Sequence, residues 1–545
     1  MNKTDLITAE EIKDSCFEAG DITPDEVLDF DIVVAGAGAA GVPAAGIAAE
    51  GGASVALIQK EANVLSQGNC ASAIIKSRST EAGIAKWIHH TNSLCDWRAD
   101  TRQLRAYAEH SEEALMWVLN RSGMTKETSY GDGSKVDSNT KSAELLNDGD
   151  ILKAFISTSG DFTGVWKDRD KTYDYGDDHC YFMAPWVGPK PLNVGYALRK
   201  ALDKVSEAHP ALKTFFSTPA VKLVISEGKV TGLIAKDQDG RYIQFNARKA
   251  VILATGDYTN NNAMVRRWCP DIDQFDKKQH NKTGDGHLLA MSAGAVMEPQ
   301  GHTKMMHDFD SALMFEEPFL YLNMNGERFT NEYTGFVYMG NLLKYQPPFK
   351  GSMLDEAHKE EGSRGWYCTI YDDDYVNWPK DSFVSGMVPP QVMEKFIPGA
   401  VENPQGVFKN LIDLHRCDTL EELAGELGIP YDKMKASVDR YNELCEKGSD
   451  DDFGKPAKYM HKIAKAPFWG ARKHIRVSAA VSGIMTDEYC RALDRDGKVI
   501  EGLYCAGNLG GPFYGGSDYP FHQTGLSLGR CYTSGLIAAR HALGN

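Results

Sequence analysis

A glycine-rich turn near the start of the chain has the residue spacing of a pyrophosphate-binding cradle. Residues 36 to 41 read G-A-G-A-A-G, a complete G-x-G-x-x-G. Gly36 permits a tight turn, Gly38 lets a pyrophosphate approach the backbone, and Gly41 lets the flanking strand and helix pack closely. The helix that follows offers N–H groups and the positive end of its dipole to the phosphates. We therefore expect this turn, including Ala39 and Ala40, to bind a dinucleotide.

The elements on both sides of the turn support this interpretation. Phe30 to Ala35 is a short β-branched run, as expected of a buried parallel strand. Small residues continue to Ala49 as a predicted helix, and Ser54 to Ile58 is a second apolar strand. The glycine spacing alone would be weak evidence, but between a strand and a helix it is specific.

The residue that would hold the adenosine ribose departs from the usual pattern. Dinucleotide-binding proteins place an acidic residue about 20 residues after the glycines, near the end of the second strand. Here that position falls near Gln59, which is followed by Lys60 and Glu61, and we expect Gln59 and Lys60 to contact the dinucleotide. Because a glutamine oxygen also accepts hydrogen bonds, the ribose could be held by Gln59 or by Glu61.

The overall composition narrows the class of protein. At 545 residues the chain is long enough for more than one domain, and its 42% apolar and 25% charged residues are ordinary for a soluble protein. A net charge of −16 argues against nucleic acid or an anionic membrane as a partner. The acidic first residues lack a signal-peptide core and no stretch is apolar enough to span a membrane, so we expect a cytoplasmic protein. The 11 cysteines include no C-x-x-C pair, so we expect no haem, iron–sulfur cluster or other metal.

The order of the motifs predicts an α/β fold in which one domain interrupts another. We expect residues 1–28 to form an N-terminal extension and residues 29–297 the first part of a Rossmann-like domain with a parallel sheet. The composition changes at residues 298–477, which we expect to form an α+β domain, and residues 478–545 return to the first domain. A stretch of about 130–190, including Tyr173 to His179, lacks periodicity. It predicts a long insertion, either functional or a surface embellishment.

Apolar periodicity and turn residues predict the main elements along the chain. The expected helices are Thr8 to Glu18, Ala106 to Leu119, Pro191 to Ala208, Glu421 to Leu427, Tyr431 to Glu446 and a C-terminal helix from Gly525 to His541. The expected strands after the first two are Ala220 to Ile225, Val230 to Ala235, Tyr242 to Phe245, and a separate one from Lys249 to Gly256.

Six motifs, taken in order, resemble one flavoprotein superfamily. They are VVAGAGAAG at 33–41, AVILATG at 250–256, TGDG at 283–286, NGERFTNE at 325–332, GLYCAGN at 502–508 and TGLSLGR at 524–530. In this order and spacing they resemble the fumarate reductase and succinate dehydrogenase flavoproteins, a superfamily that also holds ketosteroid dehydrogenases and ene-reductases of anaerobes. The resemblance covers residues 30 to 545 apart from the insertion. It implies FAD in the cradle and a capping domain over the flavin, with the substrate between the two domains.

The resemblance also implies roles for individual residues. The implied FAD contacts beyond the cradle are Gly68 and Asn69 in the flavin-side turn, Thr255 and Gly256 by the adenosine half, Asp285 in a loop beside the flavin, Asn508 in place of the glutamate that holds the ribityl chain, and Gly525, Ser527 and Leu528 at the start of the C-terminal helix. That helix N-terminus would face the pyrimidine edge, where reduced flavin is negatively charged. Membrane-bound members attach FAD through a histidine in the stretch from Leu65 to Asn69. None is present here, so we expect non-covalent FAD.

Three features that bind a dicarboxylate in fumarate reductases are missing. Those enzymes use an arginine in N-R-L-G-G, a histidine in H-T-M-G-G and an arginine shortly after the N-E pair. In this chain the first two positions hold His522 and Ala480, and no arginine follows Asn331-Glu332 closely. We therefore expect that fumarate and succinate are not substrates.

Two candidate catalytic residues precede the C-terminal helix. Tyr519-Pro520 resembles the Tyr-Pro pair of ketosteroid dehydrogenases, although the spacing to the helix is longer here, and His522 follows it. A tyrosine hydroxyl can donate to a ketone oxygen or deliver a proton, and aromatic walls suit a flat apolar substrate. We expect Tyr519 to be the proton donor.

Three further candidates lie near or in the predicted cap. His302 is part of a G-H-T that resembles the H-P-T of the reductases, and Tyr333 and Tyr338 follow the N-E pair. The alternative is structural: both tyrosines could pack the cap. His302 and His307, which flank a Met-Met pair, could likewise be core histidines with their hydrogen bonds satisfied.

We therefore expect an FAD-dependent oxidoreductase that reduces an activated C=C bond of a neutral ring substrate, such as a steroid enone or a plant polyphenol. Hydride would come from flavin N5 and the proton from a tyrosine or histidine. One alternative is a ketosteroid-type dehydrogenase working in the oxidative direction. Another is a flavin electron-transfer subunit of a larger complex. The chain has no second cradle and no haem motif, so a reduced carrier or a redox partner protein would supply the electrons.

Overall fold

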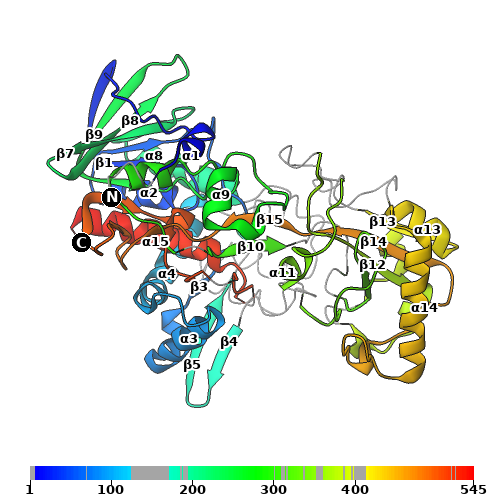
Figure 1. Ribbon diagram of the computed structural model, residues 1–545. Coiled ribbons are helices and arrows are strands. Elements are labelled where there is room, and N and C mark those ends of the chain that lie inside the picture. The colour runs from blue at the N-terminus through cyan, green and yellow to red at the C-terminus, as the bar shows by residue number, and fades with distance from the viewer. Residues whose placement is uncertain are drawn as a thin grey trace.

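An eight-stranded sheet carries the glycine-rich turn (Figure 1). The computed structural model describes residues 7–68, 70–123, 171–184, 187, 194–299, 301–307, 314, 317–335, 338–350, 360–383, 387–394, 397, 413–516, 518–521 and 523–544. The strands are β1 (Glu26–Ala35), β2 (Val55–Ile58), β6 (Leu212–Phe215), β7 (Ala220–Ser226), β8 (Lys229–Lys236), β9 (Tyr242–Leu253), β17 (Arg491–Leu493) and β18 (Val499–Cys505). Parallel pairs join β6, β2, β1, β9 and β18, whereas β7, β8 and β17 are antiparallel additions. The predicted α/β fold with a parallel sheet is confirmed.

Helices pack beside this sheet and cover its apolar strands. They are α2 (Gly41–Glu50), α4 (Thr101–Ser122), α8 (Val194–Ala208) and α15 (Leu526–Leu543), which pack on one another. Small residues let α2 approach α4, since a Cβ on Gly46 would lie 2.3 Å from the Trp117 ring. The other helices here are α1 (Ala9–Lys13), α3 (Glu81–Leu94), α9 (Asn262–Trp268) and α10 (Asp285–Ser292). Among the described residues, no helix has the length and apolar character that crossing a membrane takes.

Several sequence-based boundaries are wrong in this part; for example, β1 begins at Glu26 and not at Phe30, and α4 begins at Thr101 and not at Ala106. The helix expected from Thr8 to Glu18 ends at Lys13, because the chain then turns and the Glu18 N–H bonds to the Val221 carbonyl. The two strands expected around residues 242–256 form one strand, β9, which pairs with β8 along its first half and with β18 along its second. No glycine or proline interrupts it, so the strand exchanges its neighbour without ending.

The described end of the predicted insertion is ordered as a β-hairpin. Strands β4 (Lys171–Tyr175) and β5 (Asp178–Met183) pair around a turn at Gly176, whose φ is +83°, and β5 also pairs with β3 (Ala73–Ile74). The stretch from Tyr173 to His179 is therefore not a loop. The hairpin extends away from the main sheet (Figure 1). Many of its residues are therefore polar, and the sequence does not show the alternation of apolar and polar residues that is typical of a strand. Residues 124–170 lie outside the described part of the chain.

A second, smaller sheet lies beyond two connecting strands, on the side away from the main sheet (Figure 1). The chain runs into this part through β10 (Lys304–His307) and returns through β15 (Arg476–Ala480), and these two strands pair. The sheet is antiparallel, in the order β11 (Leu320–Leu322), β12 (Trp366–Asp372), β14 (Phe468–His474), β13 (Leu414–Cys417). Helices α13 (Leu420–Leu427) and α14 (Tyr431–Lys447) pack on it, and α11 (Met339–Leu343) and α12 (Pro390–Met393) belong to the same stretch. The α+β character expected of the inserted part is confirmed. Strands β16 (Ile484–Met485) and β19 (Gly510–Gly511) form a further parallel pair.

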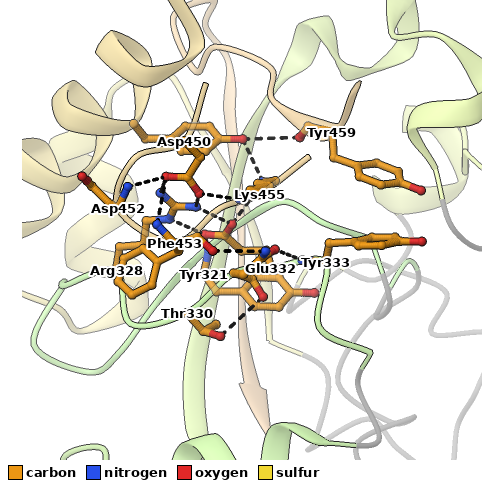
Figure 2. Close-up of polar contacts among 12 residues, drawn as sticks. Tyr321, Arg328, Thr330, Glu332, Tyr333, Asp450, Asp452, Phe453, Lys455 and Tyr459 are labelled. Atoms are coloured by element: carbon orange, nitrogen blue, oxygen red, sulfur yellow. Dashed lines mark hydrogen bonds and ion pairs between the residues drawn. The ribbon is translucent and has the colours of Figure 1, made fainter. Parts of the chain in front are cut away.

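A buried ion-pair network holds distant segments of this smaller part together (Figure 2). The Arg328 guanidinium contacts Glu332 and Asp450, each at 2.7 Å. The Lys455 ammonium lies 3.3 Å from Glu332 and donates to the Tyr441 hydroxyl at 2.8 Å. Although burial opposes ionisation, hydrogen bonds from Arg328 lower the pKa of Asp450 to about 2. The network therefore links the segment before α11 to the segment after α14.

We predict that Arg328→Met destabilises this part strongly. The change leaves two buried carboxylates facing the single positive charge of Lys455, and breaking a buried pair costs about 3–5 kcal/mol of unfolding free energy. Arg440→Met is the matched control, because Arg440 makes its ion pairs with Asp452 and Glu443 at the surface. The midpoint of denaturant unfolding should shift to a lower denaturant concentration for Arg328→Met and stay unchanged for Arg440→Met. Equal midpoints for both variants would contradict the importance of the network.

Candidate active site

A cavity lies where the parallel strands β1, β2 and β9 end. It is lined by the turn after β1, by residues that follow β2 and β9, by the start of α15, and by residues of β10 and β15. Ligands of open α/β sheets bind outside the carboxyl ends of the strands, because the strand-to-helix turns meet there. The cavity therefore joins the predicted cradle to the strands that lead into the smaller part.

The backbone of the glycine turn is packed tightly on its strand side. Gly36 has a φ of +105°, and a Cβ there would lie 2.3 Å from the Ala254 carbonyl oxygen. A Cβ on Gly41 would lie 1.7 Å from the Gly36 oxygen. Gly38 has more room, since the nearest atom to a Cβ would be the Leu65 oxygen at 3.2 Å. Helix α2 then begins without a capping side chain, although its Val42 N–H already bonds to the Gly38 carbonyl at 3.1 Å and Pro43 has no N–H, so a phosphate would depend mainly on the N–H groups of the turn itself.

The N-terminus of α15 also lines the cavity and holds a tyrosine there. Gly525 precedes the helix with a φ of +77°, and the Ser527 N–H donates to the Tyr519 hydroxyl oxygen at 2.9 Å. Tyr519 is buried, and this burial raises the pKa of its hydroxyl. The phenol is therefore protonated at neutral pH. Because its oxygen already accepts from Ser527, the phenol proton is left for another acceptor.

The residues that follow β2 carry acceptors and one ion pair. The Gln59 amide nitrogen donates to the Asn63 carbonyl at 3.1 Å, which leaves its side-chain oxygen as an acceptor. Glu61 also lines the cavity, so both candidates for the ribose remain. Lys60 pairs with Asp285 at 2.9 Å. This contact places Asp285 in the cavity wall beside the end of β2, and its implied place beside the flavin stays a prediction.

Most of the residues implied to bind FAD share this cavity. Its lining includes Gly36, Gly38, Ala39, Ala40, Gln59, Lys60, Gly68, Thr255, Gly256, Asp285, Asn508, Gly525, Ser527 and Leu528. Gly41 is behind the turn, against Gly36. Asn69 lies outside the described residues.

The candidate catalytic residues separate into two groups. Tyr519 lines the cavity, and His522 lies outside the described residues. His302 does not line the cavity. It is 2% exposed, accepts from the Tyr258 hydroxyl at 2.6 Å and contacts the Glu298 carbonyl at 3.1 Å. Burial lowers the pKa of His302 to about 4, so it is a neutral core histidine with both nitrogens bonded.

The two cap tyrosines also lie away from the cavity. Tyr333 is 48% exposed and stacks on Tyr459 with ring centroids 4.4 Å apart, beyond the Arg328 network (Figure 2). Tyr338 is 46% exposed and precedes α11. Neither is among the residues that line the cavity, so the packing alternative describes Tyr333 better than a role in chemistry.

Several residues of the cavity wall were not predicted to lie there. They include Ser478 of β15, Phe521, and Met305 and His307 of β10, of which His307 was expected as a possible core histidine. Met305 and His307 are two residues apart, and alternate residues of a strand share a face. Had the segment from Lys304 to His307 been recognised as a strand, this alternation would have placed His307 beside Met305 on one surface.

The cavity residues fit FAD. The Thr255 hydroxyl lies in the wall, is buried, and has no hydrogen-bond partner within the described part of the chain. Buried polar atoms are nearly always hydrogen-bonded, so this atom indicates a ligand. The N-termini of two helices face the same space, that of α2 without a capping side chain and that of α15 with its Ser527 N–H bonded to Tyr519. They match the two electron-rich groups of FAD, its pyrophosphate and its pyrimidine edge.

We predict that Gly38→Val abolishes FAD binding and leaves the fold intact. The branched side chain would occupy the space through which the pyrophosphate approaches the backbone. Gly41→Val is a useful contrast, because its Cβ meets backbone and should prevent folding. The Gly38 variant should purify soluble and colourless, with native far-ultraviolet circular dichroism. A fully yellow variant would remove the pyrophosphate site from Gly38.

Comparison with known proteins supports this assignment. A family model described as FAD binding domain matches residues 31–518. A vinyl phenol reductase of Lactiplantibacillus plantarum is 26% identical over 546 residues, which cover 94% of this chain and 96% of that protein. An open flavocytochrome c3 fumarate reductase has a similar structure, with a TM-score of 0.64, 19% identity, and coverage of 95% of this chain and 79% of that one. The structure of a 3-ketosteroid delta1-dehydrogenase from Sterolibacterium denitrificans is also similar, with a TM-score of 0.63 and 20% identity. The match covers 95% of this chain and 99% of that one.

The two likenesses to solved structures concern the fold, whereas the family match spans nearly the whole chain and coincides with the cradle and the cavity. The protein belongs to the FAD binding domain family, and it is an FAD-dependent oxidoreductase of the superfamily that includes fumarate reductases and ketosteroid dehydrogenases.

Proposed function

We propose that the protein reduces a C=C bond conjugated to an oxygen-bearing group in a neutral ring substrate, such as a steroid enone or a plant polyphenol. The observation that carries this proposal is the Tyr519 phenol, held in the cavity wall by the N-terminus of α15 with its proton available. In this proposal residues 29–297 and 478–545 hold FAD, and residues 298–477 cap it.

When bound, FAD supplies the hydride that the β-carbon of the substrate accepts. Negative charge then develops on the oxygen conjugated to the double bond, and Tyr519 donates its proton toward that oxygen. A neutral donor already in place at this position stabilises the transition state more than the ground state. The Ser527 N–H and the helix N-terminus in turn stabilise charge that shifts onto the phenol oxygen.

The cavity wall supports a neutral substrate. Its two lysines are paired, Lys60 with Asp285 at 2.9 Å and Lys282 with Asp257 at 2.9 Å. Among the described residues of the wall there is no arginine to bind a dicarboxylate. Apolar and aromatic side chains, among them Met305 and Phe521, line part of the remaining surface, beside uncharged polar ones such as Gln279 and Asn281. The names of the vinyl phenol reductase and the 3-ketosteroid delta1-dehydrogenase also refer to ring compounds.

The second candidate is the same chemistry in the oxidative direction. The likeness to the ketosteroid dehydrogenase structure favours it, and Tyr519 would then polarise a ketone while a hydride leaves the neighbouring carbon. An electron-transfer subunit is a weaker alternative. Such a subunit needs no proton donor, whereas the wall of this cavity holds the buried Tyr519 phenol. In the reductive direction a reduced carrier or a redox partner protein would supply the electrons.

A single anaerobic experiment tests the proposal. The photoreduced holoenzyme is mixed with steroid enones, vinyl phenols, polyphenols and fumarate, and the return of oxidised flavin absorbance is followed together with product analysis. We expect rapid reoxidation by at least one ring compound and none by fumarate. Reoxidation by small artificial acceptors alone would favour the electron-transfer subunit.

We predict that Tyr519→Phe slows reoxidation by the substrate by roughly 100-fold or more, the usual scale for losing a donor or general acid in the transition state. The variant removes one oxygen and keeps the ring, so FAD content and photoreduction should be unchanged. Tyr333→Phe is the matched control, since the exposed Tyr333 lies outside the cavity. Near-native turnover of Tyr519→Phe would remove Tyr519 from the chemistry.

We further propose that FAD is bound non-covalently, because the stretch from Leu65 to Asn69 has no histidine. Acid precipitation of the yellow protein should release all of the flavin absorbance into the supernatant. Flavin that sediments with the denatured protein would show a covalent bond.

A further inference from the structure

A chain of hydrogen bonds runs from the cavity wall to a lysine at its back. The Ser478 hydroxyl lies 2.7 Å from Nε2 of His307, and Nδ1 of His307 lies 3.0 Å from Nζ of Lys278. Ser478 and His307 both line the cavity, whereas Lys278 does not. Lys278 is only partly buried, so part of this residue is exposed to solvent.

The chemistry of the lysine sets the direction of these hydrogen bonds. An ammonium group only donates, so Nδ1 of His307 must accept from Lys278. The ring proton is then on Nε2 and is donated to the Ser478 oxygen, and the Ser478 proton remains for an acceptor in the cavity. Burial, together with the positive charges of Lys278 and Arg476, lowers the pKa of His307. The imidazole is therefore neutral and can pass a proton from one nitrogen to the other.

The backbone holds the three side chains in register. The pairing of β10 with β15 shifts by one residue, with Met305 opposite Ala479 and Met306 opposite Val477, so Ser478 is the extra residue of a β-bulge. Bulges re-aim side chains and occur beside active sites. The Lys278 N–H bonds to the Val477 carbonyl at 2.9 Å, and the Lys282 ammonium bonds to the Ser478 carbonyl at 2.9 Å.

We propose that Lys278, His307 and Ser478 form a proton relay that delivers the proton required at the α-carbon of the substrate. This inference rests on the proposed reduction of a C=C bond. The Ser478 O–H bond breaks as a C–H bond forms at the α-carbon, the Nε2 proton of His307 moves to the Ser478 oxygen, and a Lys278 proton moves to Nδ1. Lys278 regains its proton from solvent. One solvent proton and the hydride thus saturate the double bond, and Tyr519 acts on the substrate oxygen.

The kinetic test uses variants that keep the hydrogen bonds but block proton transfer. In His307→Gln the amide can accept from Lys278 and donate to Ser478, yet it cannot exchange protons between its two ends. In Lys278→Arg the positive charge and the donor remain, but the guanidinium holds its proton too strongly to release it. Ser478→Ala removes the last donor. The matched control is His89→Gln, an exposed position on α3.

Each relay variant is photoreduced as holoenzyme and mixed anaerobically with the ring substrate that the wild-type protein reduces. We expect reoxidation to be slower by roughly 100-fold, as for other lost general acids. Reoxidation by ferricyanide, which needs no proton on carbon, should be unchanged. Wild-type rates with both acceptors in His307→Gln and Lys278→Arg would overturn the relay. If the wild-type protein itself reduces no C=C compound, the proposed function fails instead.

A spectroscopic test is independent of turnover. In protein labelled with ¹⁵N-histidine, the signal lost in His307→Gln identifies His307. We expect this signal to show an unprotonated Nδ1 and a protonated Nε2 at neutral pH. A proton on Nδ1, or a doubly protonated ring, would reverse or abolish the donor order and overturn the proposal.

Discussion

The contact between Gly36 and Gly41 is the constraint on which the rest of the structure depends. The carbonyl of Gly36 occupies the place that a side chain on Gly41 would need, so β1 and α2 meet backbone to backbone. This close approach brings the start of α2 to the end of the parallel sheet. The cavity, the helix terminus that suits a phosphate, and the path of α15 across α2 all follow from that arrangement. A larger residue at either glycine would separate strand from helix before it affected any ligand.

The part of the site that could be predicted from the sequence is the part made by backbone. A glycine spacing indicates local backbone geometry, and apolar runs indicate buried strands. The cradle and the parallel sheet could therefore be predicted. The same local signals predicted α8, α13 and α14 to within a few residues. They wrongly divided β9 into two strands, because local signals do not show that β1 pairs along the whole strand while β8 and β18 pair with successive halves of its other edge.

Side chains that act through tertiary contacts were harder to predict. His302 and His307 lie five residues apart with similar neighbours in the sequence, yet one is enclosed between Tyr258 and Glu298 and the other lines the cavity. The difference arises because His302 lies before β10 begins, whereas His307 belongs to β10, whose pairing with β15 joins residues more than 160 positions apart. Tyr333 shows the opposite error. A motif placed it near the chemistry, whereas its ring found an aromatic partner at the surface.

The bulge at Ser478 has a consequence for how the length of the chain can vary. Successive residues of a strand point to opposite faces, so one residue more or less exchanges the buried set for the exposed set along the whole strand. Only Ile475 separates β14 from β15, which leaves no loop to absorb such a change. Apart from the loss of Ser478 itself, which is the extra residue of the bulge, a single deletion between Phe468 and Ala480 would therefore shift the alternation of buried and exposed residues in β14 or in β15. Insertions and deletions in this protein should accumulate at the turns of the smaller part, while this continuous stretch keeps its number of residues.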